Sequence, residues 1–273
     1  MLAFAANSLL CRLALGQELI DAASFATVRV GSGAVVLTLM MLPRWRVRAR
    51  AQTDWRSVAV LFAYMVLFSF AYLSLSAGTG ALILFGAVQL TMFIAALRGG
   101  EKFALLSWAG LALAVIGLVY LVSPGLTAPD PMNAILMAIA GIAWGFYSLL
   151  GRGISDPLEA TANNFIYSVP LVIIVSLLFK DEYHSTLSGL LLAVVSGAIT
   201  SGLGYVIWYS ALRGLTATRA ATVQLSVPAI AAFGGVVLLS EQITLRLVLA
   251  SVATLGGVWI VLAQRAARPV KSS

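Results

Sequence analysis

Three side-chain amides stand inside long apolar stretches of this chain. Asn7, Gln89 and Gln224 each lie in a run of predominantly hydrophobic residues. An amide in a hydrocarbon surrounding must find a hydrogen-bond partner, and a polar solute is one such partner. We therefore expect these residues to line a ligand-binding cavity, with hydrogen bonds between neighbouring segments as the structural alternative.

Aromatic side chains recur in the same stretches at helical spacing. Tyr64, Phe68 and Tyr72 are each separated by four positions, which places them on one face of a helix. Pro228 lies in the middle of another apolar run and lacks a backbone donor, so it is expected to kink its helix. Packing, or an aromatic belt at the membrane interface, is the alternative for such residues. The cavity wall is also predicted to contain Tyr72, Phe85, Trp144, Tyr147, Tyr205, Trp208 and Pro228.

The sequence does not assemble a catalytic or metal-binding set. The only histidine, His184, lies in a polar run at 180–184, and the single cysteine, Cys11, excludes an internal disulfide. A serine protease would need a Ser/His pair within the membrane, and a prenyl-transferring enzyme would need aspartate-rich motifs. We expect no catalytic residue, no metal and no cofactor. An intramembrane enzyme is the alternative from a different class.

The elements that must position these residues follow from the composition. The 273 residues are 61% hydrophobic and only 10% charged, with a mean hydropathy of +1.00. Soluble domains carry about 25% charged residues, so a soluble surface cannot be built here. The basic residues lie between apolar runs and form no basic face for a nucleic acid. The pattern predicts an all-α integral membrane protein. Its ten expected spans are 1–15, 21–43, 56–76, 79–98, 103–123, 131–151, 158–179, 187–212, 217–239 and 245–263.

The charge distribution predicts how these spans are oriented. Most of the 17 Lys and Arg residues fall on one side of the expected membrane, including five arginines between positions 44 and 56. Connections rich in Lys and Arg stay in the cytoplasm, so both termini are expected to be cytoplasmic in an inner, or plasma, membrane. The first apolar run has neither a charged leader nor a cleavage site, so we expect no signal peptide. This run is also short for a complete span.

The charged residues that lie more than two positions from the end of an expected span are Arg12 and Arg29. We expect both to be structural, either paired with a loop acid such as Glu18 or Asp21 or extended toward the interface. Contact with a substrate carboxylate is the alternative for Arg29. All ten acidic residues lie in loops or at helix ends, and Glu101 and Glu241 are each expected to face the N-terminus of the next span. Without a carboxylate at membrane depth, a strongly cationic substrate is disfavoured.

The two halves of the sequence resemble each other at a constant offset of 140 residues. Aligned pairs include 7–12 with 147–152, Glu101 with Glu241, and Gly117 with Gly257. A unit of five spans is odd in number, so the second unit must enter the membrane from the opposite side. We therefore expect two inverted five-helix repeats around a central cavity, residues 1–126 and 127–273.

The chain resembles the EamA-type family of the drug/metabolite transporter superfamily over essentially its whole length. The resemblance is clearest from Trp208 to Gly257, and Trp144-Gly145 is similar to a tryptophan–glycine signature that opens a helix in this family. The first span departs from that signature, with Phe4-Ala5-Ala6 in its place. The run 78–85 looks most like bacterial amino-acid exporters of the YddG kind. The resemblance implies ten helices, cytoplasmic termini, a central cavity and alternating access.

These patterns predict a membrane transporter and not an enzyme. We expect an exporter or facilitator of small neutral or zwitterionic metabolites, above all amino acids, including aromatic and apolar ones. A nucleotide-sugar or phosphorylated-metabolite antiporter is the alternative within transport, although its cargo would require basic residues at membrane depth. The expected partners are a small-molecule substrate and the lipid bilayer, with no nucleic acid, and the chain is expected to be able to act as a monomer.

Overall fold

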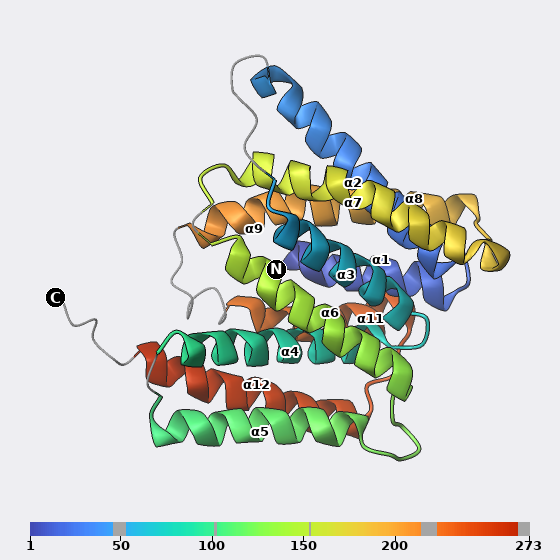
Figure 1. Cartoon of the computed structure of the whole chain (residues 1–273). Coiled ribbons are helices and arrows are strands. Elements are labelled where there is room, and N and C mark those ends of the chain that lie inside the picture. Colours follow the sequence, from blue (N-terminus) through green and yellow to red (C-terminus); the bar gives the residue numbers. More distant parts are fainter. Residues whose placement is uncertain (46–52, 101–102, 153, 214–222, 267–273) are drawn as a thin grey trace.

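The structure, a computed structural model, describes residues 1–45, 53–100, 103–152, 154–213 and 223–266. Within these residues the secondary structure is helical, apart from an isolated bridge between Ile20 and Ser185. The helices are arranged roughly along one common direction (Figure 1). Their bounds are α1 Leu2–Gly16, α2 Ala22–Trp45, α3 Trp55–Ala71, α4 Ala77–Arg98, α5 Leu105–Val122, α6 Pro131–Leu150, α7 Pro157–Leu178, η1 Lys180–Glu182, α8 Leu187–Val195, η2 Ser196–Leu203, α9 Gly204–Leu212, α11 Ser226–Leu239 and α12 Leu245–Ala266.

Within the described residues, seven helical segments are long and apolar enough to cross a membrane. One of them is the continuous rod Leu187–Leu212, which consists of α8, η2 and α9. Three further helices, α1, α3 and α11, are apolar but shorter. Each expected span coincides largely with one of these segments, and the crossing of the membrane by the three shorter helices stays a prediction.

Capping residues determine where many of the helices begin. A side-chain oxygen in front of the helix accepts a hydrogen bond from a backbone N–H of the first turn, which satisfies a donor that the helix leaves unpaired. This arrangement occurs at the starts of α3, α4, α6, α7 and α8, where the capping residues are Asp54, Ser76, Asp130, Asp156 and Thr186.

One expected helix boundary is wrong. The span expected at 56–76 ends as a helix at Ala71, because the following residues turn toward the cap of α4. Pro228 lies in the first turn of α11, just after an interruption of the helix: residues 223 and 224 are helical and Leu225 forms a turn. This interruption agrees with the kink expected at Pro228, because a proline removes a backbone hydrogen bond. Residues 217–222 of the span expected at 217–239, and Glu101, lie outside the described residues.

The helix ends gather at two opposite ends of the molecule (Figure 1). Helices α2, α4, α6, α9 and α12 finish at one end, which we call the Arg152 end. Helices α1, α3, α5, α7 and α11 finish at the other, which we call the Glu241 end. This alternation is what a chain that repeatedly crosses a bilayer requires.

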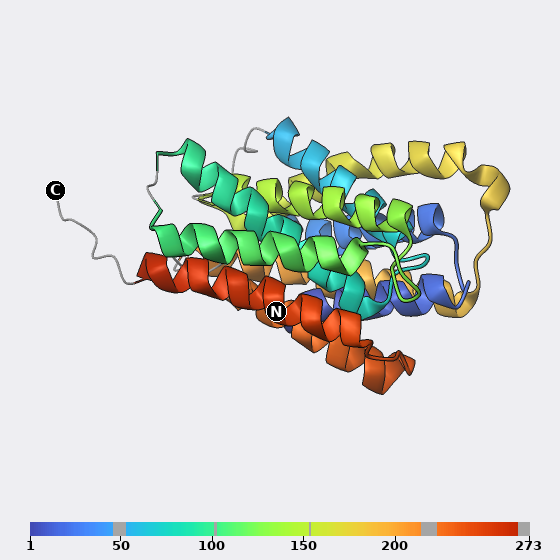
Figure 2. The same ribbon diagram turned by 90° about the horizontal axis from the view of Figure 1, so that it is seen from below.

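Many packing contacts join the first half of the chain to the second. Helix α2 packs on α7, α4 packs on α11, and α3 packs on α6 and α7. Helix α1 lies against α11 and η2. Helices α5 and α12 form an extended pair, and they lie side by side in both views (Figures 1 and 2).

Small residues allow the close approach of α5 and α12. A Cβ atom added to Gly117 would lie 2.6 Å from Oγ1 of Thr254. A Cβ atom added to Gly257 would lie 2.6 Å from the backbone nitrogen of Ala114. An offset of 140 residues converts Gly117 into Gly257 and Ala114 into Thr254. The 140-residue offset that relates the two halves of the sequence therefore relates these two contacts as well. In each contact, a glycine of one helix faces a residue of the other helix, and these two facing residues, Thr254 and Ala114, are also equivalent under the offset.

The segment η2 is a π-helix, and it crosses α2 at very close range. A Cβ atom added to Gly197 would overlap the carbonyl oxygen of Arg29 and the hydroxyl oxygen of Ser32. A Cβ atom added to Gly33 would meet the ring of Phe165 and the carbonyl oxygen of Gly197. The absence of side chains at both glycines lets the two backbones touch, and the crossing fixes the position of Arg29. π-helical turns occur frequently at functional sites.

Candidate functional site

Aromatic rings from four helices meet in the interior of the protein. Phe4 of α1 lies 5.3 Å from Trp144 of α6 and 5.7 Å from Trp208 of α9, measured between ring centres. Phe4 also lies 6.4 Å from Phe85 of α4 and 6.0 Å from Tyr205 of α9. All five side chains are buried. We call these five residues the aromatic cluster.

Four predicted cavity residues, Phe85, Trp144, Tyr205 and Trp208, therefore come together in one place. A fifth, Tyr147, adjoins them at 5.5 Å from Trp144. Ring pairs at such separations attract each other beyond the burial of their surfaces. Sequence reasoning missed Phe4, because it stood there only as a departure from the family signature.

Arg29 of α2 is fully buried beside the aromatic cluster. Its Nε donates to Oγ of Ser201 at 2.9 Å, and its Nη2 donates to the hydroxyls of Tyr205 at 3.0 Å and Tyr64 at 3.3 Å. The guanidinium carbon also lies 4.8 Å from the ring centre of Phe68. The expectation that Arg29 pairs with a loop acid or extends to the interface is therefore wrong, since its partners are neutral groups in the interior.

The acids expected near Arg29 do not pair with it. Asp21 accepts hydrogen bonds from the backbone N–H of Ser24 at 2.8 Å and of His184 at 3.3 Å, so it holds the start of α2. Between two described residues, one ion pair is formed, and it joins Arg12 to Glu241. The charge of Arg29 therefore has no carboxylate partner among the described residues.

Two buried donors at this site lack a hydrogen-bond partner among the described residues, namely Nη1 of Arg29 and Nε1 of Trp208. Leaving a buried donor unsatisfied costs about 1–3 kcal/mol, and more for a charged group. Native exceptions are rare, and each calls for a physical reason. A bound solute that accepts these hydrogen bonds is one such reason.

The amide of Asn7 is hydrogen-bonded on both sides within the protein. Its Oδ1 accepts from the hydroxyls of Ser196 at 2.7 Å and Thr200 at 2.6 Å, and its Nδ2 donates to Ser201 at 3.0 Å. These bonds tie α1 to η2 and hold Ser201, which in turn accepts from Arg29. The contacts favour the structural alternative for Asn7, and its contact with a solute stays a prediction.

The two glutamines occupy different surroundings. Gln224 is fully buried, and its Oε1 accepts a hydrogen bond from Nε1 of Trp144 at 3.4 Å, so it reaches the aromatic cluster. Gln89 lies one helical turn after Phe85 in α4 and contributes to the wall of a cavity. Both amides are thus placed where a polar solute could contact them.

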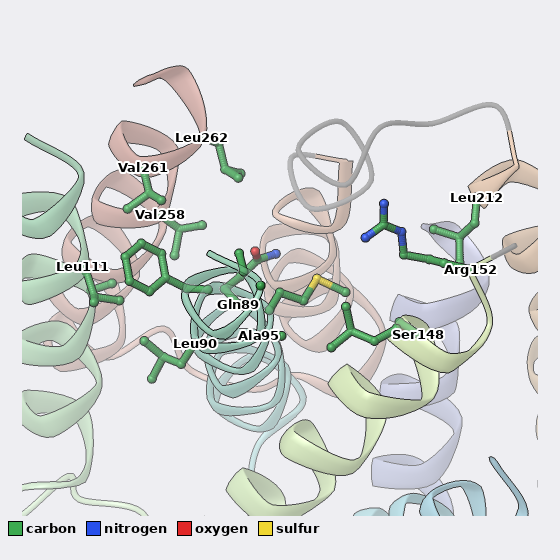
Figure 3. A pocket seen from close by; sticks show the side chains of 16 residues that line it. Gln89, Leu90, Ala95, Leu111, Ser148, Arg152, Leu212, Val258, Val261 and Leu262 are labelled. Carbon is green, nitrogen blue, oxygen red and sulfur yellow. The ribbon is translucent and has the colours of Figure 1, made fainter. Parts of the chain in front are cut away.

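That cavity has a volume of about 190 Å³ and lies at the Arg152 end. Figure 3 shows Gln89 in its wall between α4 and α12, with Ser148 and Arg152 on the side of α6. None of the five residues of the aromatic cluster lines it. Apolar side chains form most of the remaining wall, including those of Leu90, Leu111, Leu212, Val258, Val261 and Leu262.

A second hollow, of about 900 Å³, lies between α4, α5 and α6. Its wall is almost entirely apolar and includes the exposed side chains of Val119 and Ile135. Exposed apolar side chains of this kind cover much of the helical surface. This hollow suits the acyl chains of lipids, and it does not bring together the polar groups that would bind a solute.

A charged link joins α1, α4 and the turn before α12 at the Glu241 end. Nε of Arg12 lies 3.2 Å from Oε1 of Glu241, and the same carboxylate accepts from the backbone N–H of Ala77 at 2.9 Å. Arg12 also donates to the carbonyl oxygens of Tyr72 at 3.4 Å and Leu73 at 3.2 Å. We call this set the Arg12–Glu241 link. Arg12 thus pairs with an acid between two helices, as expected, although that acid is Glu241 and not Glu18 or Asp21. The expectation that Glu241 faces the N-terminus of the next span is wrong, because the N-terminus it contacts is that of α4.

Tyr72 and Pro228 lie outside the aromatic cluster. Tyr72 is buried just beyond α3, and its hydroxyl donates to the carbonyl oxygen of Ala77 at 3.3 Å. Pro228 is buried in the first turn of α11. These positions tie Tyr72 to the Glu241 end and Pro228 to a helix start, and a role of either residue in solute binding stays a prediction.

Comparison with known proteins identifies the family. The profile of the EamA-like transporter family matches residues 132–263, a range that includes Trp144, Tyr205, Trp208 and Gln224. The chain belongs to the EamA-like transporter family. The resemblance found in the sequence is thereby confirmed. Membership in this family indicates a multi-pass membrane transporter and not an enzyme.

The chain is also similar to other proteins in sequence and in structure. An uncharacterized protein of Pseudomonas aeruginosa is 48% identical over 99% of this chain and 94% of its own length. A probable amino-acid metabolite efflux pump of Salmonella typhimurium is 25% identical over 72% of this chain and 71% of its own. A solved crystal structure with 19% identity superposes with a TM-score of 0.69, covering 99% of this chain and 97% of that chain, and shows that the fold is shared.

Proposed function

We propose that this EamA-like transporter is a carrier of small neutral or zwitterionic metabolites, with amino acids that have aromatic or apolar side chains as preferred cargo. The aromatic cluster is the observation that carries the proposal. It joins helices of residues 1–126 to helices of residues 127–273, and it offers ring faces beside amide and guanidinium donors. Sites for small molecules are predominantly apolar with a few placed polar groups.

We propose further that residues 1–126 and 127–273 are inverted repeats and that ten helices cross the bilayer. The exchange of the contacts Gly117–Thr254 and Ala114–Gly257 under the 140-residue offset supports this proposal. The packing of α2 on α7 and of α4 on α11 supports it as well, because each pairs a helix with its counterpart in the other half. In transporters built from inverted repeats, the substrate site lies at the repeat interface near the midplane.

The orientation proposed for the carrier places the Arg152 end in the cytoplasm and the chain in the inner membrane. The concentration of Lys and Arg at the connections of that end supports the orientation. Reporter fusions at the C-terminus test it. A reporter active only in the cytoplasm should be active there, and a reporter active only outside the cytoplasm should be silent. The reverse pattern would contradict the orientation.

The structure fits one state of an alternating-access cycle. The Arg12–Glu241 link ties α1, α4 and the turn before α12 together at the Glu241 end. The cavity that contains Gln89 lies at the opposite end. A carrier in such a state receives its cargo from the Arg152 end. Opening of the other end requires the Arg12–Glu241 link to break.

Proteoliposomes provide the test of the proposed cargo. Purified protein should carry labelled phenylalanine, leucine and other apolar amino acids across the membrane without added energy. The same vesicles are assayed with a phosphorylated sugar and a nucleotide sugar, and with proton or sodium gradients imposed. Flux of the phosphorylated solutes in the absence of amino-acid flux would overturn the proposed substrate class.

Two variants connect this flux to the candidate site. Gln89→Ala and Gln224→Ala should each reduce amino-acid flux while protein yield is maintained, since each removes an amide beside the aromatic cluster or the cavity. Gln17→Ala is the matched control, because Gln17 is exposed at the end of α1. Unchanged flux in both buried-site variants would remove the two glutamines from the site.

A further inference from the structure

We infer that Arg29 is the subsite that binds the carboxylate of the cargo. The preferred solute is then a monocarboxylate. Within the proposed function, it is an amino acid bound through its carboxylate end. This inference rests on the proposed function for the identity of the cargo. The role of Arg29 itself rests on its own contacts. Its side chain is fully buried, carries a charge and has one nitrogen, Nη1, with no hydrogen-bond partner among the described residues.

The bonds that Arg29 makes hold the guanidinium without neutralising it. Nε and Nη2 donate to the hydroxyls of Ser201, Tyr205 and Tyr64, all of which are neutral. The plane of the group is supported from the side by Phe68. These contacts hold the guanidinium in place and leave the two N–H groups of Nη1 as its unused donors. A charged donor fixed in this way can form a charge-assisted hydrogen bond to one carboxylate.

The missing counter-charge is the second element of the inference. A buried charge without a partner is costly, and ionisable residues within membrane-spanning segments commonly mark substrate pathways. Arg12, which also lies away from the ends of its expected span, has a carboxylate partner in Glu241, whereas Arg29 has none in the described residues. A carboxylate brought by the cargo would supply the absent partner.

The residues around Arg29 indicate how much negative charge the cargo carries and what kind of group the rest of the cargo contains. Tyr64 and Tyr205 bond Arg29 and also pack on Trp144, so the guanidinium lies directly beside aromatic faces. One guanidinium matches one negative charge, which fits a carboxylate better than a phosphate dianion. The unpartnered Nε1 of Trp208 is a further donor on the same cluster.

The first experiment varies the ligand and leaves the protein unchanged. Trp144 and Trp208 belong to the cluster, so intrinsic tryptophan fluorescence of the purified protein reports binding without any transport. The ligands are L-phenylalanine, 3-phenylpropionate, L-phenylalaninamide and phenethylamine, which present the same ring with or without a carboxylate. Both carboxylates should bind at least about tenfold more tightly than the two ligands that lack one. Equal binding of the acids and their neutral or cationic analogues would overturn the inference.

The second experiment varies the protein. Arg29→Gln should lower the affinity for the two carboxylates to that for the amide, while Arg29→Lys should keep a reduced preference for them. A purely structural role for Arg29 would instead lower binding of all four ligands together in both variants. Arg246→Gln is the control, because Arg246 donates to carbonyl oxygens at the end of α5, away from the cluster.

These measurements separate the inference from the proposed function. Phenylalanine flux together with binding that shows no preference for carboxylate ligands would support the proposed carrier and refute the role of Arg29. Absence of amino-acid flux together with tight, Arg29-dependent binding of 3-phenylpropionate would refute the amino-acid cargo and retain the carboxylate subsite. If Arg29→Gln does not fold, the comparison of ligands on the unaltered protein still decides the question.

Discussion

Replacing Glu241 by glutamine should loosen the end of the protein at which it lies. The carboxylate of Glu241 accepts from Nε of Arg12 at 3.2 Å and from the backbone N–H of Ala77 at 2.9 Å. A glutamine can still accept from Ala77, but it carries no charge for Arg12. The substitution therefore removes the ion pair specifically and leaves the cap of α4 largely intact.

The exposure of the pair sets the size of the effect. The side chains of Arg12 and Glu241 are 25% and 15% exposed, so the pair lies between a solvated and a fully buried one. Exposed pairs contribute up to about 1 kcal/mol, and breaking a fully buried pair costs about 3–5 kcal/mol. We therefore expect the loss of the ion pair to favour opening of this end by about 1–2 kcal/mol. This free energy corresponds to a change of about 5–30-fold in the opening equilibrium.

Cys11 makes this opening measurable without any engineered probe. It is the single cysteine of the chain, it precedes Arg12 in α1, and its side chain is fully buried. A thiol reagent that modifies Cys11 only after opening should react about 5–30-fold faster in Glu241→Gln than in the unaltered protein. Arg12→Gln should give a similar acceleration, and the double variant should show far less than the product of the two effects.

Two outcomes would refute this reasoning. Labelling rates that are equal in Glu241→Gln and the unaltered protein would show that the pair does not hold the end closed. An equal acceleration in Arg246→Gln would show that any loosening at this end exposes Cys11, since Arg246 also lies there but joins α12 to α5.

Three further predictions concern stability, measured as thermal unfolding in detergent. Gly197→Ala should destabilise the protein by about 1–3 kcal/mol, because its Cβ would overlap the backbone of α2, whereas Gly31→Ala, with open space around its Cβ, should not. Gly257→Ala should destabilise the protein by a similar amount, because its Cβ would separate α5 from α12, whereas Gly256→Ala should not. Equal melting temperatures of Gly197→Ala and Gly31→Ala, or of Gly257→Ala and Gly256→Ala, would contradict the packing. Asn7→Ala should cost about 1–3 kcal/mol by leaving hydroxyls of η2 unpaired, and an unchanged melting temperature would show that those hydroxyls find other partners.

The helices could be predicted from the sequence because long apolar runs separated by polar residues mark the segments. The apolar runs alone do not determine the helix ends. The run 56–76 continues past the end of α3, whereas residues such as Asp54 and Ser76 cap the helix starts in the structure.

The candidate site was predicted in part. Large aromatic residues in apolar runs are expected to be buried, and Trp144, Tyr205 and Trp208 do meet. Their meeting around Phe4 depends on the packing of α1 against the second half, which no local pattern encodes. The same holds for Arg29. Its neighbours in sequence include acids, but its partners come from α3, η2 and α9.

Counterflow in proteoliposomes tests the central claim most directly. Vesicles that contain the protein are loaded with unlabelled L-phenylalanine and diluted into a trace of labelled L-phenylalanine. A carrier that works by alternating access should accumulate the label transiently above its outside concentration, and preloading with a phosphorylated sugar should not replace phenylalanine. Label that only equilibrates, with no overshoot and no dependence on preloading, would indicate a channel. No protein-dependent entry of label in proteoliposomes would contradict an amino-acid carrier altogether.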